Sequence, residues 1–279
     1  MRPLKCGVVC TTMLKTVVAI ISIILIPILC DAKDLSKSIA YALQTKIRLI
    51  VIDPGFGGKN TGPSGYDGTV FAKTINLQIA KKVAKRINDE LEINVILTRS
   101  TDKDISLEER TSIANTNNAD LLISIHTNGS EYSSATGIET YMLNLATDDE
   151  VITMAATANA TNQKNIAEMD SIIQDLMQNS KVRESELLAK NVQKCLINQL
   201  GVINTNLRNR GVKQAPFYIL IGADMPAIII QVGFITNPAE CKLLKSVEYQ
   251  EEISIGIVKG ISAFKKERST QPIRIEPIL

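Results

Sequence analysis

The chain has 279 residues, of which 45% are apolar and 4% aromatic, and it contains no tryptophan. This length fits one sizeable domain, because single cores grow to roughly 250–300 residues. The formal net charge is +2, and without the first 32 residues the remaining chain would carry 28 basic and 28 acidic residues, since three basic residues and Asp31 would be lost. A neutral domain gives no electrostatic reason to expect nucleic acid or an anionic membrane as a partner.

Residues 1–32 have the pattern of an export signal. Three basic residues accompany an apolar run from Thr16 to Cys30, which is shorter than the about 20 residues of a membrane-spanning helix. A weak cleavage site, Cys30-Asp31-Ala32, ends the run. We therefore predict a signal peptide and export to the periplasm or cell envelope. The alternative is an uncleaved N-terminal anchor, which would be the only contact with a membrane.

Strands and helices alternate in the first half of the chain. Arg48 to Asp53 and Leu121 to Ile125 are continuous aliphatic runs, typical of buried parallel strands. Apolar residues recur every four positions from Ile75 to Leu91, which predicts an amphipathic helix. Val95 to Thr98 reads as a short strand. Ser106 followed by Glu109 forms a capping box, which predicts a helix that ends near Asn117.

The second half continues this alternation. Its predicted strands are Gly137 to Leu143, Phe217 to Leu220 and Ala227 to Val232, and its predicted helices lie within 147–200, after Pro238 and from Tyr249 to Lys266. The pattern predicts an α/β fold, with a mostly parallel twisted sheet and helices on both faces. The predicted single domain spans residues 47–267, between a linker at 33–46 and a loose tail at 268–279.

Two cysteines, Cys195 and Cys241, lie outside the leader. An oxidising compartment would permit a disulfide between them. Two separate buried thiols are the favoured alternative.

Three segments stand at predicted strand ends, where open α/β sheets bind ligands. They are Asp53-Pro-Gly-Phe-Gly-Gly58, Ser124-Ile-His126-Thr-Asn-Gly129 and the stretch from Ile230 to Pro238. The first segment lacks the spacing of a nucleotide-binding loop. His126 is the only histidine in the chain, which excludes a metal site built from several histidines. A lone histidine at a strand end is more often structural than a metal ligand.

The chain resembles the zinc-dependent, type 3 N-acetylmuramoyl-L-alanine amidases of bacterial cell-wall turnover. The three segments carry the resemblance together with Leu97-Thr-Arg99, Ser106-Leu-Glu-Glu-Arg110 and Arg210-Gly-Val-Lys213, and the match runs from about Ile47 to Phe264. The resemblance implies a peptidoglycan substrate and cleavage of the amide between N-acetylmuramic acid and L-alanine. It also implies a zinc ion held by His, Glu and His, with a further Glu as the general base.

Three of the four positions implied by the resemblance hold other residues in this chain. Phe56 stands at the first metal histidine, Ala72 at the metal glutamate and Gln231 at the catalytic glutamate, and only His126 matches. Phenylalanine and alanine cannot donate to zinc, and glutamine cannot exchange a proton. We therefore expect zinc to bind weakly or not at all, and we expect His126, Asn128 and Gln231 to hydrogen-bond a muropeptide.

These substitutions favour a pseudoamidase that binds a muropeptide or an amidase regulator. The alternative is an active N-acetylmuramoyl-L-alanine amidase with an altered metal shell. Asp67 is the best candidate for a replacement ligand in that case, although a loop carboxylate that faces water is the more ordinary interpretation. A third alternative is a structural remnant that binds no ligand.

A helical insertion at about 147–190 is a candidate regulatory surface. In regulated amidases of this kind, a helix in this region blocks the active site until a partner displaces it. The apolar stripe from Met169 to Met177 fits such a helix. The resemblance therefore implies an amidase activator protein as a candidate partner.

Overall fold

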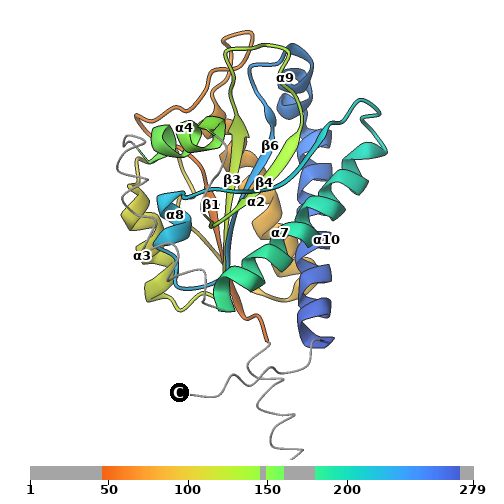
Figure 1. Ribbon diagram of the computed structural model, residues 1–279. Coiled ribbons are helices and arrows are strands. Elements are labelled where there is room, and N and C mark those ends of the chain that lie inside the picture. The colour runs from red at the N-terminus through yellow and green to blue at the C-terminus, as the bar shows by residue number, and fades with distance from the viewer. Residues whose placement is uncertain (1–45, 145–148, 160–179, 271–279) are drawn as a thin grey trace, which may run out of the picture. The chain divides into compact units, whose positions relative to one another are not determined.

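The computed structural model describes residues 46–144, 149–159 and 180–270. Within them, Ile47–Arg268 form one compact unit around a six-stranded sheet (Figure 1). The predicted leader, nearly all of the linker, residues 160–179 of the insertion and the tail beyond Thr270 lie outside the described residues. No helix within the described ranges combines the length and apolar character needed to cross a membrane.

The sheet has the strand order β2-β1-β3-β6-β4-β5. The strands are β1 (Leu49–Pro54), β2 (Asn94–Leu97), β3 (Leu121–Asn128), β4 (Ile138–Met142), β5 (Asn209–Gln214) and β6 (Ala227–Phe234). All neighbouring pairs are parallel except β4 and β6, so β4 and β5 run against the other four strands. The prediction of a mostly parallel sheet is confirmed.

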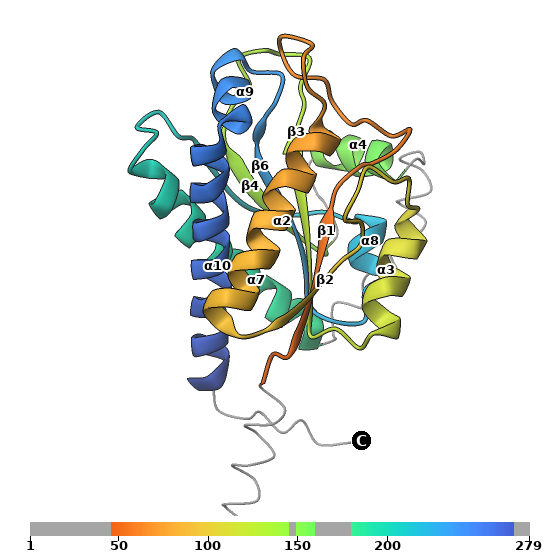
Figure 2. The same ribbon diagram turned by 180° about the vertical axis from the view of Figure 1, so that it is seen from behind.

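Helices cover both faces of the sheet, as predicted (Figures 1 and 2). One face carries α2 (Ala72–Leu91), α7 (Ser180–Gly201), α9 (Pro238–Lys245) and α10 (Val247–Thr270), and the other carries α3 (Leu107–Thr116), α4 (Asp149–Ala158) and α8 (Tyr218–Ile221). Ile50 and Ile52 pack into the first core, whereas Val51 packs into the second. Burial on both faces explains why this strand reads as an unbroken aliphatic run.

Side chains mark the starts of two helices as the sequence indicated. Ser106 Oγ accepts a hydrogen bond from the Glu109 backbone N–H at 3.1 Å, which confirms Ser106 as the N-cap of α3. Asn237 caps α9 in the same way, directly before Pro238. Both caps occupy N–H groups that a helix start leaves without partners.

In the second half, one prediction is wrong and one strand was not predicted. Phe217 to Leu220 is not a strand, because this short apolar run folds into α8 with Ile219 and Leu220 buried. Short apolar runs do not distinguish a strand from a buried helical turn. Strand β5 was not predicted, since its residues are mainly polar and only partly buried.

The two cysteines outside the leader are free thiols. Cys241 is buried in α9, whereas Cys195 in α7 is partly exposed. The disulfide alternative is therefore wrong, and only one of the two thiols is fully buried.

Candidate functional site

The carboxyl-terminal ends of β1, β3 and β6 meet at one edge of the sheet. In the strand register His126 lies beside Gln231, and Gln231 lies beside Glu139 at the start of antiparallel β4. Asp53 pairs with Ser124, two positions before His126 along β3. Alternate residues of a strand share a face, so these side chains lie on the side of α3, α4 and α8. The fold therefore assembles one row of polar side chains from four strands.

A cleft of about 1070 Å³ opens above this row. Its walls come from the strand ends, the loops after β1 and β3, and helices α3, α4 and α8, and they include Asp53, Gly55, Phe56, Arg110, His126, Asn128, Thr153, Thr157, Ile219 and Gln231. The cleft is large enough to hold a small-molecule or peptide ligand. Phe56, His126, Asn128 and Gln231 thus come together as the sequence indicated.

In the lining of the cleft, the Asp53 carboxylate is buried and fully paired. Arg110 Nη1 and Thr98 Oγ1 each donate to Oδ1 at 2.6 Å, and Ser124 Oγ donates to Oδ2 at 2.6 Å. Burial raises the pKa of Asp53, but Arg110 and the hydroxyl donors outweigh it, so the pKa lies below its ordinary value. The carboxylate is therefore ionised, and it neutralises the buried Arg110 guanidinium.

Two buried arginines hold the backbone of the loop after β1. Arg99 donates to the carbonyl oxygens of Pro54 at 3.0 Å and Gly55 at 2.9 Å. Arg110 donates to those of Pro54 at 2.9 Å and Phe56 at 2.8 Å. In the sequence, Arg99 and Arg110 stood out only as members of the segments that carry the family resemblance. Their role is to clamp the loop that carries Phe56.

His126 lies in a tightly packed, partly buried position. A Cβ atom on Gly55 would lie 2.3 Å from the imidazole, so only glycine leaves room for the ring. The Phe56 ring packs edge-on against it, with 5.0 Å between centroids. Burial lowers the pKa of His126 to about 4, so the imidazole is neutral at pH 7. His126 Nε2 lies 3.0 Å from Ser124 Oγ.

The protonation of His126 follows from this contact. Ser124 gives its only hydroxyl proton to Asp53, so Nε2 of the neutral imidazole must be the N–H that donates to Ser124 Oγ. The lone pair of His126 is then on Nδ1 alone.

Phe56 occupies an unusual backbone conformation. Its φ of 62° lies in the left-handed region, which bulky side chains rarely adopt. The ring also covers Gly62, where a Cβ atom would lie 2.3 Å from a ring carbon. The loop therefore holds Phe56 in a left-handed backbone conformation, and the Phe56 ring contacts His126.

The two amide side chains of the site differ in their bonding. Asn128 Nδ2 donates to Glu139 at 2.9 Å and Oδ1 accepts from the Gly129 N–H at 2.8 Å. Gln231 is 7% exposed, and its buried Oε1 has no hydrogen-bond partner among the described residues. Such an atom favours a donor from a ligand or water, because an unpaired buried acceptor is costly.

Ala72 and Asp67 lie outside the cleft lining. Ala72 is fully buried at the start of α2. Asp67 is exposed, and its carboxylate pairs with Lys245 at 2.6 Å. That ion pair and the Thr69 hydrogen bonds lower the pKa of Asp67. The proposed replacement ligand therefore has a partner on the surface instead.

The residues present do not fit a zinc ion. A catalytic zinc site uses three protein ligands and a water. Here His126 has one free lone pair, Phe56 packs against its ring, and Ala72 has no donor atom. Across the three described ranges, no group of three His, Cys, Asp or Glu side chains could hold a metal ion.

Comparison with known proteins gives a consistent match. Residues 50–263 match the model of the N-acetylmuramoyl-L-alanine amidase family. N-acetylmuramoyl-L-alanine amidase AmiC of Escherichia coli O6:H1 is 31% identical over 230 residues, which cover 80% of this chain and 54% of AmiC. The chain thus matches about half the length of that relative.

Solved structures agree with the fold. An N-acetylmuramoyl-L-alanine amidase from Clostridium difficile 630 has a TM-score of 0.61 and 32% identity, over 78% of this chain and 96% of that one. The CwlD amidase from Clostridioides difficile, solved in complex with the GerS lipoprotein, has a TM-score of 0.58 and 26% identity, over 79% of this chain and 99% of CwlD.

Proposed function

The chain belongs to the N-acetylmuramoyl-L-alanine amidase family, and we propose that it binds a muropeptide of the cell wall in its cleft without hydrolysing it. The observation that carries this proposal is the Phe56 ring, which packs against His126. This contact puts an apolar ring against the one imidazole that could bind a metal. The family is zinc-dependent, but this site supports no catalysis through a metal.

The loss of catalysis follows from two independent deficits. One imidazole does not hold zinc with useful affinity, because even the loss of outer-shell partners costs about 10–100-fold in metal affinity or activity. Gln231 cannot take or give a proton, and a positioned acid–base group contributes typically about 10²–10⁴-fold to a rate. Each deficit alone would strongly reduce the rate of hydrolysis, and correcting one would leave the other.

Retained binding follows from what the site keeps. The loop after β1 stays clamped by Arg99 and Arg110, so the cleft keeps its shape. The buried Oε1 of Gln231 can accept a hydrogen bond from a ligand amide, and the lone pair of His126 can accept another. A largely apolar cleft that offers a few hydrogen-bond acceptors suits an acylated sugar or peptide.

The proposed ligand requires export. The relatives named above are cell-wall amidases, and the basic and apolar pattern of residues 1–32 supports delivery to the periplasm or cell envelope. Cleavage of this leader would release the domain, and retention would anchor it to the membrane. Sequencing the amino terminus of the mature protein distinguishes the two.

The test combines zinc content, binding and hydrolysis, all on the purified full chain. We expect near zero zinc per chain by elemental analysis, co-sedimentation with purified sacculi, and no release of stem peptide. Near one zinc per chain that is lost in His126→Ala, together with chelator-sensitive release of stem peptide, would instead establish the active amidase. A folded protein that does not co-sediment with sacculi would indicate a structural remnant that binds no ligand.

A rebuilt site provides the matched control. The triple variant Phe56→His, Ala72→Glu and Gln231→Glu restores the donors that the family uses. We expect it to gain zinc and measurable hydrolysis, which would show that the assay detects activity on this scaffold. Because Ala72 is fully buried, circular dichroism must first show that the variant is folded.

The insertion offers a second candidate function, as a binding surface for an amidase regulator. Helix α4, the first part of the insertion, contributes Thr153 and Thr157 to the cleft wall, so a partner on the insertion would lie beside the site. The apolar stripe itself lies outside the described residues. Capture of an amidase activator that is lost on changing Ile172 and Leu176 to Glu would support this function, and equal capture would exclude it.

A further inference from the structure

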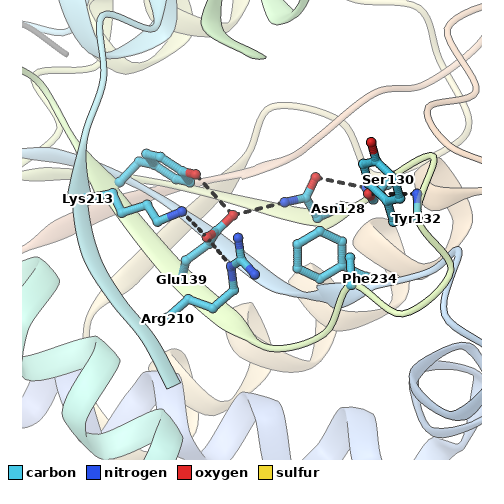
Figure 3. A pocket seen from close by; sticks show the side chains of 10 residues that line it. Asn128, Ser130, Tyr132, Glu139, Arg210, Lys213 and Phe234 are labelled. Atoms are coloured by element: carbon cyan, nitrogen blue, oxygen red, sulfur yellow. Dashed lines mark hydrogen bonds and ion pairs between the residues drawn. The ribbon is translucent and has the colours of Figure 1, made fainter. Parts of the chain in front are cut away.

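Asn128 stands in a wall that the cleft shares with a second, smaller pocket of about 230 Å³. Asn128 ends β3, and Gly129 begins the loop toward β4. These two residues form the only Asn-Gly dipeptide in the chain. Figure 3 shows the Asn128 side chain between Glu139 and the loop of Ser130 and Tyr132. Because Asn128 is only partly buried, water reaches its side chain.

Both polar ends of the Asn128 amide are held by neighbours. Nδ2 donates to Glu139 Oε1 at 2.9 Å, and Oδ1 accepts from the Gly129 backbone N–H at 2.8 Å. Glu139 is itself fixed, because a bulge in β5 brings both Arg210 and Lys213 to within 2.8 Å of its Oε2. This buried and paired carboxylate supports the Asn128 side chain in one orientation.

The hydrogen bond to Oδ1 brings the Gly129 nitrogen close to the side-chain carbonyl carbon of Asn128. Cγ is bonded directly to Oδ1, so a nitrogen 2.8 Å from Oδ1 lies about 3–3.5 Å from Cγ, the separation of a near-attack arrangement. The χ2 torsion of asparagine is broad, so a modest rotation turns the face of Cγ toward this nitrogen. The backbone nitrogen of Gly129 is therefore positioned to attack Cγ.

Packing requires glycine at position 129. A Cβ atom there would lie 2.6 Å from Cγ of Pro63, in the loop after β1, and real Cβ atoms essentially never approach so closely. Glycine has no side chain that could shield its backbone nitrogen or restrict its torsions. The contact with Pro63 therefore keeps the attacking nitrogen unhindered.

We propose that Asn128 is a site of spontaneous deamidation, which converts a neutral amide in the shared wall to a carboxylate. The Gly129 nitrogen loses its proton to hydroxide and forms a bond to Cγ. The bond from Cγ to Nδ2 breaks, and ammonia leaves after taking a proton from water. Water then opens the cyclic imide at either carbonyl, which gives aspartate or isoaspartate at position 128. The net reaction consumes a water molecule, releases ammonia and oxidises or reduces nothing.

The new carboxylate would change the shared wall. An oxygen in place of Nδ2 would lie next to Glu139 Oε1, where two like charges repel each other. Glu139 Oε1 would keep only the Tyr141 hydroxyl as a donor. Isoaspartate would also lengthen the backbone at the end of β3. We expect either product to weaken ligand binding in the cleft, and this consequence rests on the proposed function, whereas the chemical step does not.

The test follows Asn128 in the purified, folded full chain at neutral and mildly alkaline pH. Peptide mapping by mass spectrometry measures conversion of the amide to the acid, and an isoaspartate methyltransferase identifies isoaspartate. We expect conversion to be roughly tenfold faster at Asn128 than at Asn118, which is exposed but followed by alanine. The rate at Asn128 should rise with pH, because the attacking nitrogen must lose a proton. Equal rates at the two asparagines would overturn the proposal.

A denatured sample separates the effect of the fold from that of the dipeptide. The same chain in urea keeps the Asn-Gly sequence but loses the contacts of Asn128 with Glu139 and the packing of Gly129. We expect the folded chain to react at least as fast, because its near-attack arrangement is already formed. A folded chain that reacts roughly tenfold more slowly than the denatured one would overturn the proposal, since the fold would then protect Asn128.

Variants assign the reaction and its consequence. Asn128→Gln keeps an amide but must close a larger ring, so we expect no conversion at this position, and conversion as fast as in the parent would overturn the proposed route. Asn128→Asp reproduces the product, and we expect it to co-sediment less with purified sacculi. Asn206→Asp is the matched control, because this exposed asparagine lines neither space. Thermal unfolding verifies that each variant is folded.

Binding to sacculi distinguishes this inference from the proposed function. Equal binding of the folded Asn128→Asp variant and the parent would overturn the effect on the ligand. Conversion at Asn128 in a chain that does not co-sediment with sacculi would support the modification and contradict the proposed function. Binding to sacculi without conversion at Asn128 would overturn this inference and leave the proposed function intact.

Discussion

The cleft and a smaller pocket of about 230 Å³ around Glu139 share a wall but differ in chemistry (Figure 3). In the cleft, the Phe56 ring packs against His126, and the buried Oε1 of Gln231 has no hydrogen-bond partner among the described residues. In the pocket, Glu139 keeps two cations and two neutral donors. One region presents an apolar ring and an amide oxygen without a described partner, and its neighbour holds a carboxylate with four donors.

The difference separates residues that the fold requires from residues that only a function requires. The Asp53–Arg110 pair lies in the lining of the cleft, and both partners are almost fully buried. Loss of either would leave an uncompensated charge, so folding alone explains the pair. Metal ligands carry no such penalty.

The largest expected effect comes from breaking the buried pair. Arg110→Met removes the partner of Asp53 and the clamp on Phe56, and it should reduce the free energy of unfolding by about 3–5 kcal/mol. Urea denaturation at pH 7 measures this loss. Lys85→Met, which breaks an exposed pair with Asp89, should change stability by less than about 0.5 kcal/mol. A loss below about 1 kcal/mol for Arg110→Met would mean that Asp53 is not a buried ion.

An intermediate effect is expected for His126, as a dependence on pH. Its pKa is about 4 in the folded chain and about 6.5 when unfolded, so between these values the unfolded state binds more protons. Stability therefore falls as pH decreases from about 6.5 to 4. The folded chain should lose about 2 kcal/mol at pH 5 relative to pH 7 from this group.

His126→Gln is the control for this dependence. Glutamine does not titrate, so the difference in stability between pH 7 and pH 5 should shrink by that amount. Asp53 contributes in the same direction but only below its unfolded pKa of about 3.8, outside this window. An unchanged pH dependence in His126→Gln would show that the imidazole is hydrated in the folded chain.

The smallest expected effect is that of Lys213→Met on stability. Glu139 would keep Arg210, Asn128 and Tyr141 as partners, so unfolding should become easier by only about 1 kcal/mol. Urea denaturation of this variant beside Arg110→Met tests the contrast directly. A loss of unfolding free energy as large as that of Arg110→Met would show that folding requires Lys213 as much as it requires Arg110.

Much of the architecture could be predicted from local patterns. The aliphatic runs at β1, β3 and β6, the four-residue period of α2 and the capping box at Ser106 each reflect a rule that acts over a few residues. The rules failed at α8 and β5. An apolar tetrapeptide fits a helical turn or a strand equally well, and β5 forms because β4 offers it an edge, not because its own residues favour a strand.

The sequence by itself determined the family, the alternating fold, and the residues Phe56, His126, Asn128 and Gln231 at the strand ends. Only the tertiary structure decided how these residues are bonded. Strand register placed His126, Gln231 and Glu139 in one row, and the β5 bulge turned Arg210 and Lys213 toward the same carboxylate. The reason is physical. Periodicity specifies which face a residue occupies within its own element, whereas contacts between distant elements depend on pairing that the chain reaches only when it packs.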